Sequence, residues 1–258
     1  MKVDSRYLTM ILTEIHDSVG VLKLNRGVTN AINLNLVSEI TKNLQKMKKE
    51  SDIRGLVLST ANEKFFAIGF DIPELFELER NDFKKYYQSF NQLCLELYTF
   101  PKPTIAALTG HAIAGGCIIA LCCDYRYIAE GRKLMGLNEV KLGVPIPYPG
   151  DCILRQLIGD RNAMEMIYTG DFYPSEKLLE MGVVNKVLPL DQVLNESISK
   201  ATSLGTLPQE AFRRIKRNRV ELVETQIREN LAEKEQIFLE HWFSDTTREL
   251  LKVAMKKF

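Results

Sequence analysis

The sequence predicts an α/β protein whose strands pair mostly in parallel. Three short apolar segments, each closed by turn-forming residues, have the composition of buried strands: residues 18–25, 53–60 and 103–110. Between the first two lies a segment whose apolar residues recur at helical spacing: Leu36, Ile40, Leu44 and Met47. Asn33 or Asn35 suits the N-cap of that helix. Strands that alternate with helices favour a largely parallel sheet.

The same alternation continues along the chain. We expect a helix over residues 83–97, a helix that starts at Gly115 and Gly116 and continues through Leu121, and a late strand near Val183. After Pro208 the sequence is charged and helical throughout. Its broad apolar faces indicate packing against another subunit or the protein's own body: Leu222, Ile227, Leu231, Ile237, Leu239 and Trp242. Residues 143–150, rich in proline and glycine, predict a loop of restricted conformation.

Composition narrows the class of protein. The 258 residues carry 34 basic and 33 acidic side chains, so no overall field favours nucleic acid or an anionic membrane. Five cysteines without metal-ligand spacing indicate reduced thiols in the core and no metal site. The N-terminal segment lacks the pattern of a secretion signal, and no apolar run reaches the ~18 residues of a membrane span. We therefore expect a soluble cytoplasmic protein.

Three stretches combine into a candidate site: KFFAIGFDIPEL (64–75), GHAIAGGC (110–117) and MGLNEVKLGV (135–144). The first is expected to end a strand before a turn. The second ends a strand and starts a helix, where the first N–H groups have no partner within the helix and the helix dipole is positive. Two such amides that converge on one point would bind a developing oxyanion.

In this order, the three stretches resemble the crotonase (enoyl-CoA hydratase/isomerase) superfamily. The resemblance runs from Val19 to the C-terminus and is strongest over residues 65–188. It implies a spiral of β-β-α units with a C-terminal helical region. The expected division is a crotonase-like core over residues 1–200 and a helical trimerisation region over 201–258, assembled as a homotrimer or homohexamer.

The resemblance also implies roles for individual residues. The amides of Phe70 and Gly115 would hold the thioester carbonyl of an acyl-CoA substrate. Further substrate-binding positions follow from the matching motifs: Ala67, Ile68, Gly69, Asp71, Ile72, Gly116 and Ile118. Arg26 is expected to reach a phosphate of CoA, although the family's usual proline after it is replaced by Gly27. The C-terminal residues 256–258 could also lie near the adenine, as C-terminal residues do in relatives. Asp71 has a structural alternative, which is to cap the turn that presents Phe70.

One carboxylate separates two chemistries of this superfamily. Its hydratases use two glutamates, one to orient water and one to protonate C2. Here Ile118 stands at the first position and Glu139 alone remains. A single acid/base group suffices to move a double bond from C3 to C2, and the local sequence resembles Δ3,Δ2-enoyl-CoA isomerases. An apolar Ile118 would keep water away and raise the pKa of Glu139 by desolvation. No separate cofactor is expected, because coenzyme A is part of the substrate.

Several alternatives stay open at this stage. The chain could be an enoyl-CoA hydratase, another acyl-CoA hydrolase or lyase of this superfamily, or a non-catalytic subunit that binds CoA esters. Gly115 and Gly116 could serve only close helix packing, and Glu139 could be an ordinary surface carboxylate. The basic run at 213–219 is typical of a solvated helix face rather than a nucleic-acid site.

Overall fold

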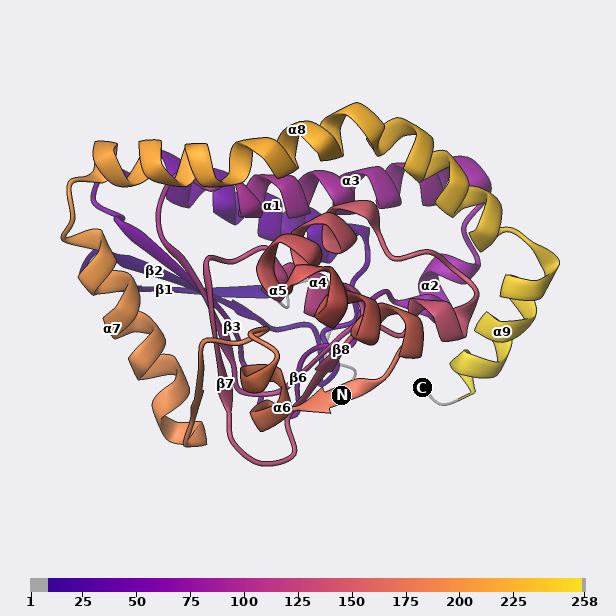
Figure 1. The fold of residues 1–258 in the computed structure, drawn as a ribbon, viewed down its shortest axis with the longest axis horizontal. Helices are drawn as coiled ribbons and strands as arrows, with labels where there is room; N and C mark the ends of the chain where they lie inside the picture. The colour runs from indigo at the N-terminus through magenta and orange to yellow at the C-terminus, as the bar shows by residue number, and fades with distance from the viewer. Residues whose placement is uncertain (1–8, 257–258) are drawn as a thin grey trace, which may run out of the picture.

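The computed structural model describes residues 9–256 and confirms the α/β class with a C-terminal helical region (Figure 1). Within this range the larger sheet has the order β1-β2-β3-β5-β7-β10. Its strands are β1 Ile11–His16, β2 Val19–Leu24, β3 Gly55–Thr60, β5 Thr104–Leu108, β7 Tyr125–Ala129 and β10 Lys186–Leu188. All neighbours pair in parallel except β1 and β2, which form an antiparallel hairpin. The predicted parallel pairing is therefore confirmed, and β1 is a strand that the sequence analysis did not assign.

A second, smaller sheet has the order β4-β6-β8-β9. Its strands are β4 Phe65–Ala67, β6 His111–Ile113, β8 Leu134–Gly136 and β9 Phe172–Pro174. The first three pair in parallel, and β9 closes the edge antiparallel to β8. The three stretches identified in the sequence each overlap one of the parallel strands of this sheet, and β8 begins one residue before the third stretch.

Helices cover the sheets and build the C-terminal region. They are α1 Leu34–Lys49, α2 Ile72–Phe76, α3 Arg80–Tyr98, α4 Gly115–Leu121, the 3-10 helix η2 Glu139–Leu142, α5 Tyr148–Thr169, α6 Ser175–Glu180, the 3-10 helix η3 Leu190–Gln192, α7 Val193–Gly205, α8 Gln209–Trp242 and α9 Asp245–Met255. In Figure 1 the long helix α8 runs over α3 along the top of the molecule, and α9 lies at the far end from α7. None of the helices within residues 9–256 combines the length and apolar character needed to cross a bilayer.

The central strands β2, β3, β5 and β7 of the main sheet are buried on both faces, which explains their nearly continuous apolar sequence. Because side chains alternate along a strand, Val21 and Val57 pack beneath α7. Leu22 and Leu56 point the other way, into the larger core shared with α1 and α3. Asn33 caps α1 by accepting a hydrogen bond from the Leu36 N–H at 2.9 Å. It is one of the two residues that the sequence offered as the N-cap.

Two boundaries differ from the sequence-based expectation. The predicted loop over residues 143–150 ends early, because α5 already begins at Tyr148. Pro147 occupies the N-cap and Pro149 the first turn, where a missing N–H costs no helical hydrogen bond. The late strand predicted near Val183 begins at Lys186, and Val183 itself is buried before it.

The predicted domain boundary after residue 200 falls inside α7, which packs on β3 and β5 of the main sheet. The chain leaves that sheet after Gly205, and α8 begins at Gln209. The apolar residues Ile227, Leu239 and Trp242 of α8 pack against the protein's own body, one of the two expected partners. Of the three C-terminal residues considered for a place near the adenine, Lys257 and Phe258 lie outside the described residues.

Helix α4 approaches β4 so closely that Gly116 has no room for a side chain. A Cβ at this position would lie 2.2 Å from the Ala67 carbonyl oxygen and 2.8 Å from its carbonyl carbon. Both are main-chain atoms, which cannot move aside without shifting the strand. The close-packing role considered for the glycine pair therefore applies to Gly116.

We predict that Gly116→Ala lowers the free energy of unfolding by about 1–3 kcal/mol or more, because it forces main-chain atoms apart. Chemical denaturation measures the effect. The matched control is Gly115→Ala in the same helix, where a Cβ would meet only side-chain atoms, the nearest at 3.2 Å. Equal losses in the two variants would contradict the assigned role of Gly116.

Candidate active site

The carboxyl ends of β4, β6 and β8 meet at one edge of the small sheet. Since the three strands are parallel, the residues that follow them converge: Ile68–Phe70 after β4, Ala114–Gly115 after β6, and Asn138–Glu139 after β8. A cavity of about 710 Å³ opens at this edge and is lined by residues from all three segments. Its volume lies in the range of small-molecule sites, and its position is the usual one for ligands in α/β proteins.

The Phe70 N–H points away from the neighbouring chain segment. Ile32 forms a parallel bridge with Phe70, in which the Ile32 N–H donates to Gly69 O at 2.7 Å and the Asp71 N–H donates to Ile32 O at 3.0 Å. In parallel pairing, the residue between two such bonds directs its own N–H to the opposite side. That side holds the start of α4, and no acceptor for the Phe70 N–H is found within residues 9–256.

Gly115 supplies the second free amide as the first residue of α4, where an N–H has no partner within the helix. The preceding residue, Ala114, has φ +49° and ψ −122°, a conformation that alanine rarely adopts. Its N–H donates to Gly136 O at 2.8 Å, which ties this turn to β8. Strain of this kind persists where the surrounding structure enforces it, often at functional sites. The strain at Ala114 fixes the direction of the Gly115 N–H.

A buried asparagine anchors the loop on the other side of β4. Asn30 donates from Nδ2 to Phe66 O at 3.0 Å and to Thr60 Oγ1 at 2.9 Å, and its Oδ1 accepts the Arg26 N–H at 2.7 Å. These bonds join the loop before α1 to two strands. They hold Ile32 in place and, through it, the bridge that orients Phe70.

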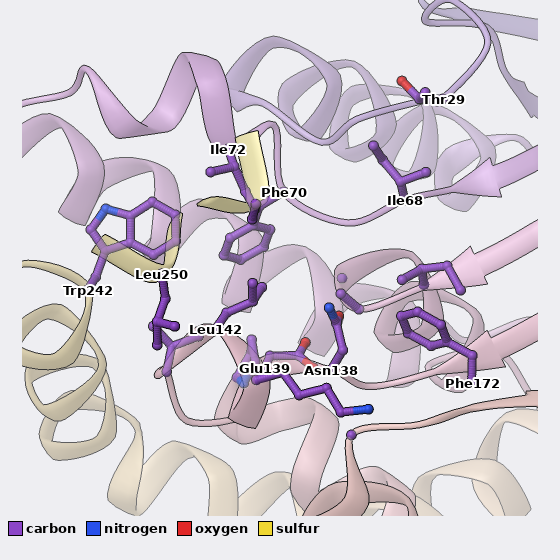
Figure 2. Close-up of a pocket in the computed structure, with 18 of the residues that line it drawn as sticks. Thr29, Ile68, Phe70, Ile72, Asn138, Glu139, Leu142, Phe172, Trp242 and Leu250 are labelled. Carbon is purple, nitrogen blue, oxygen red and sulfur yellow. The ribbon is translucent and has the colours of Figure 1, made fainter. Parts of the chain in front are cut away.

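Glu139 carries the only carboxylate among the described residues that line the cavity. It begins η2, is 5% exposed, and its Oε2 has no hydrogen-bond partner within residues 9–256. Burial raises the pKa of its side chain from 4.5 to about 8. A hydrogen bond with its own backbone N–H lowers the pKa by a smaller amount. Figure 2 shows its carboxylate below Phe70, on the opposite wall of the cavity. The alternative of a surface carboxylate is therefore wrong.

The predicted site residues divide into two groups. Those that line the cavity are Phe70, Gly115, Glu139, Ile68 and Ile72. Those that stand outside its lining are Arg26, Ala67, Gly69, Asp71, Gly116 and Ile118. Ile118 is fully buried and packs on Gly150 in the first turn of α5. It contributes to the dry core behind the site rather than to the cavity wall.

Arg26 and Asp71 are engaged with each other. Arg26 Nη1 lies 2.7 Å from Asp71 Oδ2 and donates to Ala31 O at 2.7 Å, while Nη2 contacts Glu74 Oε2 at 3.1 Å. Asp71 also caps α2 by accepting the Glu74 N–H, the structural role considered from the sequence. The predicted phosphate contact of Arg26 stays a prediction, since the guanidinium here holds the turn after Phe70.

Sequence reasoning missed other residues of the cavity. Asn138 precedes Glu139, and its Oδ1 is buried without a partner within the described residues. In Figure 2 its side chain points into the cavity beside Glu139. Further lining comes from the C-terminal helices: Phe238, Trp242, Leu250, Val253 and Ala254. Their spacing in the sequence indicated only an apolar helix face, and which face meets the cavity depends on tertiary packing.

Two main-chain amides without an acceptor within residues 9–256 line the same cavity as a buried carboxylate, and such a site is suited to proton transfer beside a carbonyl group. The sequence profile described as enoyl-CoA hydratase/isomerase matches residues 14–257, and the chain belongs to this family. The family assignment made from the three stretches is thereby confirmed.

Individual relatives point in two directions. The chain is 32% identical over 200 residues to mouse mitochondrial enoyl-CoA delta isomerase 1, covering 77% of this chain and 69% of the mouse protein. It is also 32% identical over 229 residues to a probable enoyl-CoA hydratase of Mycobacterium bovis, covering 88% of each chain. The crystal structure of human mitochondrial delta3-delta2-enoyl-CoA isomerase superposes with a TM-score of 0.93 at 26% identity, over 96% of this chain and 97% of the human one.

We predict that Glu139→Gln changes how stability depends on pH. The folded state, in which the pKa of Glu139 is about 8, binds a proton that the unfolded state releases near 4.5. The contribution of Glu139 to wild-type stability therefore falls as pH rises between these values, and the glutamine variant lacks this contribution. Denaturation from about pH 5 to about pH 8 should show the variant gaining stability relative to wild type as pH rises. A constant difference across this range would contradict the raised pKa.

Proposed function

We propose that the protein is a Δ3,Δ2-enoyl-CoA isomerase that uses Glu139 as its single acid/base group. The observation that carries this proposal is the cavity lining, where Glu139 is the only carboxylate among the described residues. The same cavity is lined by Phe70 and Gly115, whose main-chain N–H groups have no acceptor within residues 9–256. The similarity to mouse and human isomerases supports it.

The mechanism follows from these groups. The Glu139 carboxylate removes a proton from C2 of a 3-enoyl thioester, and the electron pair moves onto the thioester oxygen to give a dienolate. The N–H groups of Phe70 and Gly115 stabilise that oxyanion by hydrogen bonding. The protonated Glu139 then returns the proton to C4, and the electrons of the dienolate re-form the thioester carbonyl with a double bond between C2 and C3. One carboxyl group thus acts first as base and then as acid.

The environment of Glu139 suits both halves of this cycle. A carboxylate whose pKa is about 8 is a stronger base than an exposed one, and its conjugate acid still donates a proton near neutral pH. General acid–base catalysis contributes about 10²–10⁴ in rate, and one oxyanion donor contributes about 10²–10³.

A hydratase is the second candidate, favoured by the Mycobacterium bovis relative. Hydration needs a further polar group to orient the attacking water. The position where hydratases carry their other glutamate holds Ile118, which is buried against Gly150. Asn138 is the remaining polar side chain next to Glu139, and an amide is a weaker base than a carboxylate. Isomerisation is therefore the better supported chemistry.

The opposite ends of the cavity suit the two parts of an acyl-CoA. Thr29 lies on the side away from Trp242, and Lys64 and Lys141 are the cationic residues among the described cavity lining, to which an anionic CoA moiety would bind. In this proposal coenzyme A arrives as part of the substrate and no separate cofactor takes part.

A homotrimer or homohexamer is the proposed assembly. A cytoplasmic location stays a prediction, because the mouse and human relatives are named as mitochondrial.

We predict that Glu139→Gln lowers kcat for isomerisation of 3-hexenoyl-CoA by about 10²–10⁴, because the amide cannot accept the C2 proton. The rise in ultraviolet absorbance of the conjugated thioester measures turnover. Binding of hexanoyl-CoA, which lacks a double bond, should stay within a few-fold of wild type and serves as the control. Turnover close to wild type would refute the assignment, and loss of 2-enoyl-CoA absorbance by hydration in the wild type would favour the hydratase.

We also predict that kcat/KM for isomerisation rises with pH through an apparent pKa near 8, since the carboxylate form of Glu139 is the base. The profile is measured with 3-hexenoyl-CoA, with the stability of the protein checked at each pH. An apparent pKa near the ordinary carboxyl value of 4.5 would show that Glu139 is not the base, or that it is solvated in the free enzyme.

A further inference from the structure

The side chains labelled at one end of the cavity are apolar. Figure 2 shows Glu139 and Phe70 in the middle, Thr29, Ile68 and Phe172 towards one side, and Trp242 and Leu250 at the other. Further apolar residues of the cavity lining belong to η2, the segment before α5, and the last two helices: Leu142, Val144, Pro147, Phe238, Val253 and Ala254. A hydrocarbon chain is the ligand that such a surface binds.

Trp242 lies at the limit of this end and is held rigidly. Its indole is 2% exposed and stacks on Phe83, with ring centroids 4.2 Å apart. Phe238, one turn earlier on α8, stacks on Tyr87 at 4.0 Å. In Figure 2 the indole nitrogen is on the side turned away from Glu139, so the cavity meets the hydrocarbon edge of the ring. A wall that belongs to a close-packed aromatic cluster yields little to a longer ligand.

The helix α9 closes the cavity beside Trp242. Leu250 and Val253 line the cavity, although they are 37% and 56% exposed. The same two side chains therefore separate the cavity from solvent. Two hydrogen bonds hold the helix: Thr247 Oγ1 donates to Gly143 O at 2.8 Å, and Arg248 Nη2 donates to Phe76 O at 2.8 Å. The Arg248 guanidinium also stacks on the Phe76 ring. A chain that extends from Glu139 along α9 therefore meets Trp242.

We propose that Trp242, backed by Phe83, ends the acyl half of the cavity and sets the longest acyl chain that the protein accepts. This inference rests on the proposed function in so far as the ligand is an acyl-CoA. It adds a specificity-determining residue that takes no part in proton transfer. The limit lies in the C-terminal helices rather than in the proline-rich segment before α5.

The test measures the affinity of saturated acyl-CoAs of increasing length, from butanoyl-CoA to hexadecanoyl-CoA, by isothermal titration calorimetry. These ligands require no turnover. Wild-type affinity should rise about threefold to fivefold for each added methylene until the chain reaches Trp242, and should then stop rising. Trp242→Ala should move this break to chains several methylenes longer and leave butanoyl-CoA binding within a few-fold.

Two further variants serve as a fallback and as a control. Trp242→Phe retains an aromatic ring against Phe83 and should move the break by fewer methylenes, which covers the case in which the alanine variant does not fold. Phe243→Ala is the matched control, because Phe243 follows Trp242 in the sequence but does not line the cavity. Its ring packs against the same Phe83 ring, with the two ring centroids 5.7 Å apart. Its break should coincide with that of the wild type.

The outcomes separate the two proposals. A break that stays in place in both Trp242 variants, or a wild-type affinity that rises without a break, overturns the role of Trp242 while acyl-CoA binding stands. Failure of every acyl-CoA to bind the wild type overturns the proposed function and this inference together. A break that moves with Trp242 in a protein without isomerase activity supports the wall and refutes only the assigned reaction.

Discussion

The contact between Gly116 and the main chain of Ala67 determines where α4 can lie, and much of the site depends on it. The strand β4 and the helix α4 come from distant parts of the chain, yet their main chains touch. This contact brings the Gly115 N–H alongside the turn that carries Phe70. Parallel pairing of β4, β6 and β8 then adds the segment that carries Glu139 at the same edge. The cavity is thus a product of strand order and of one position without a side chain.

Local sequence was sufficient for the parts of this arrangement that depend on backbone chemistry. The start of α4 at Gly115 was predicted correctly, and Asn33 at the cap of α1 was one of two predicted candidates, because each follows from the residues at one helix end. The cavity position of Glu139 was also predicted, since it rested on its match to a family motif. The proline-rich segment was harder, because proline both ends loops and begins helices, and here it begins α5.

The remaining differences arise from tertiary contacts. The phosphate contact of Arg26 stays a prediction, but its engagement by two carboxylates from the start of α2 was not foreseen, because their proximity depends on the fold of the preceding loop. Ile118 faces α5 rather than the cavity, because the side that a helix residue presents is set by the neighbours that cover it. Trp242 was recognised only as part of an apolar face. Its place at one end of the cavity results from the path of α8 over α3.

The two proposed oxyanion donors, Phe70 and Gly115, are peptide N–H groups and not side chains. Replacing either residue by another amino acid other than proline leaves the donor present, so scanning mutagenesis of side chains would overlook both. In evolutionary terms, such donors are inherited with the backbone and tolerate sequence drift around them. The carboxylate and the hydrocarbon walls of the cavity are side chains, so a single substitution can change each of them. The two main-chain N–H donors persist through such changes. New reactions on this scaffold therefore need few substitutions, and these are expected among the residues that face the substrate's carbon skeleton.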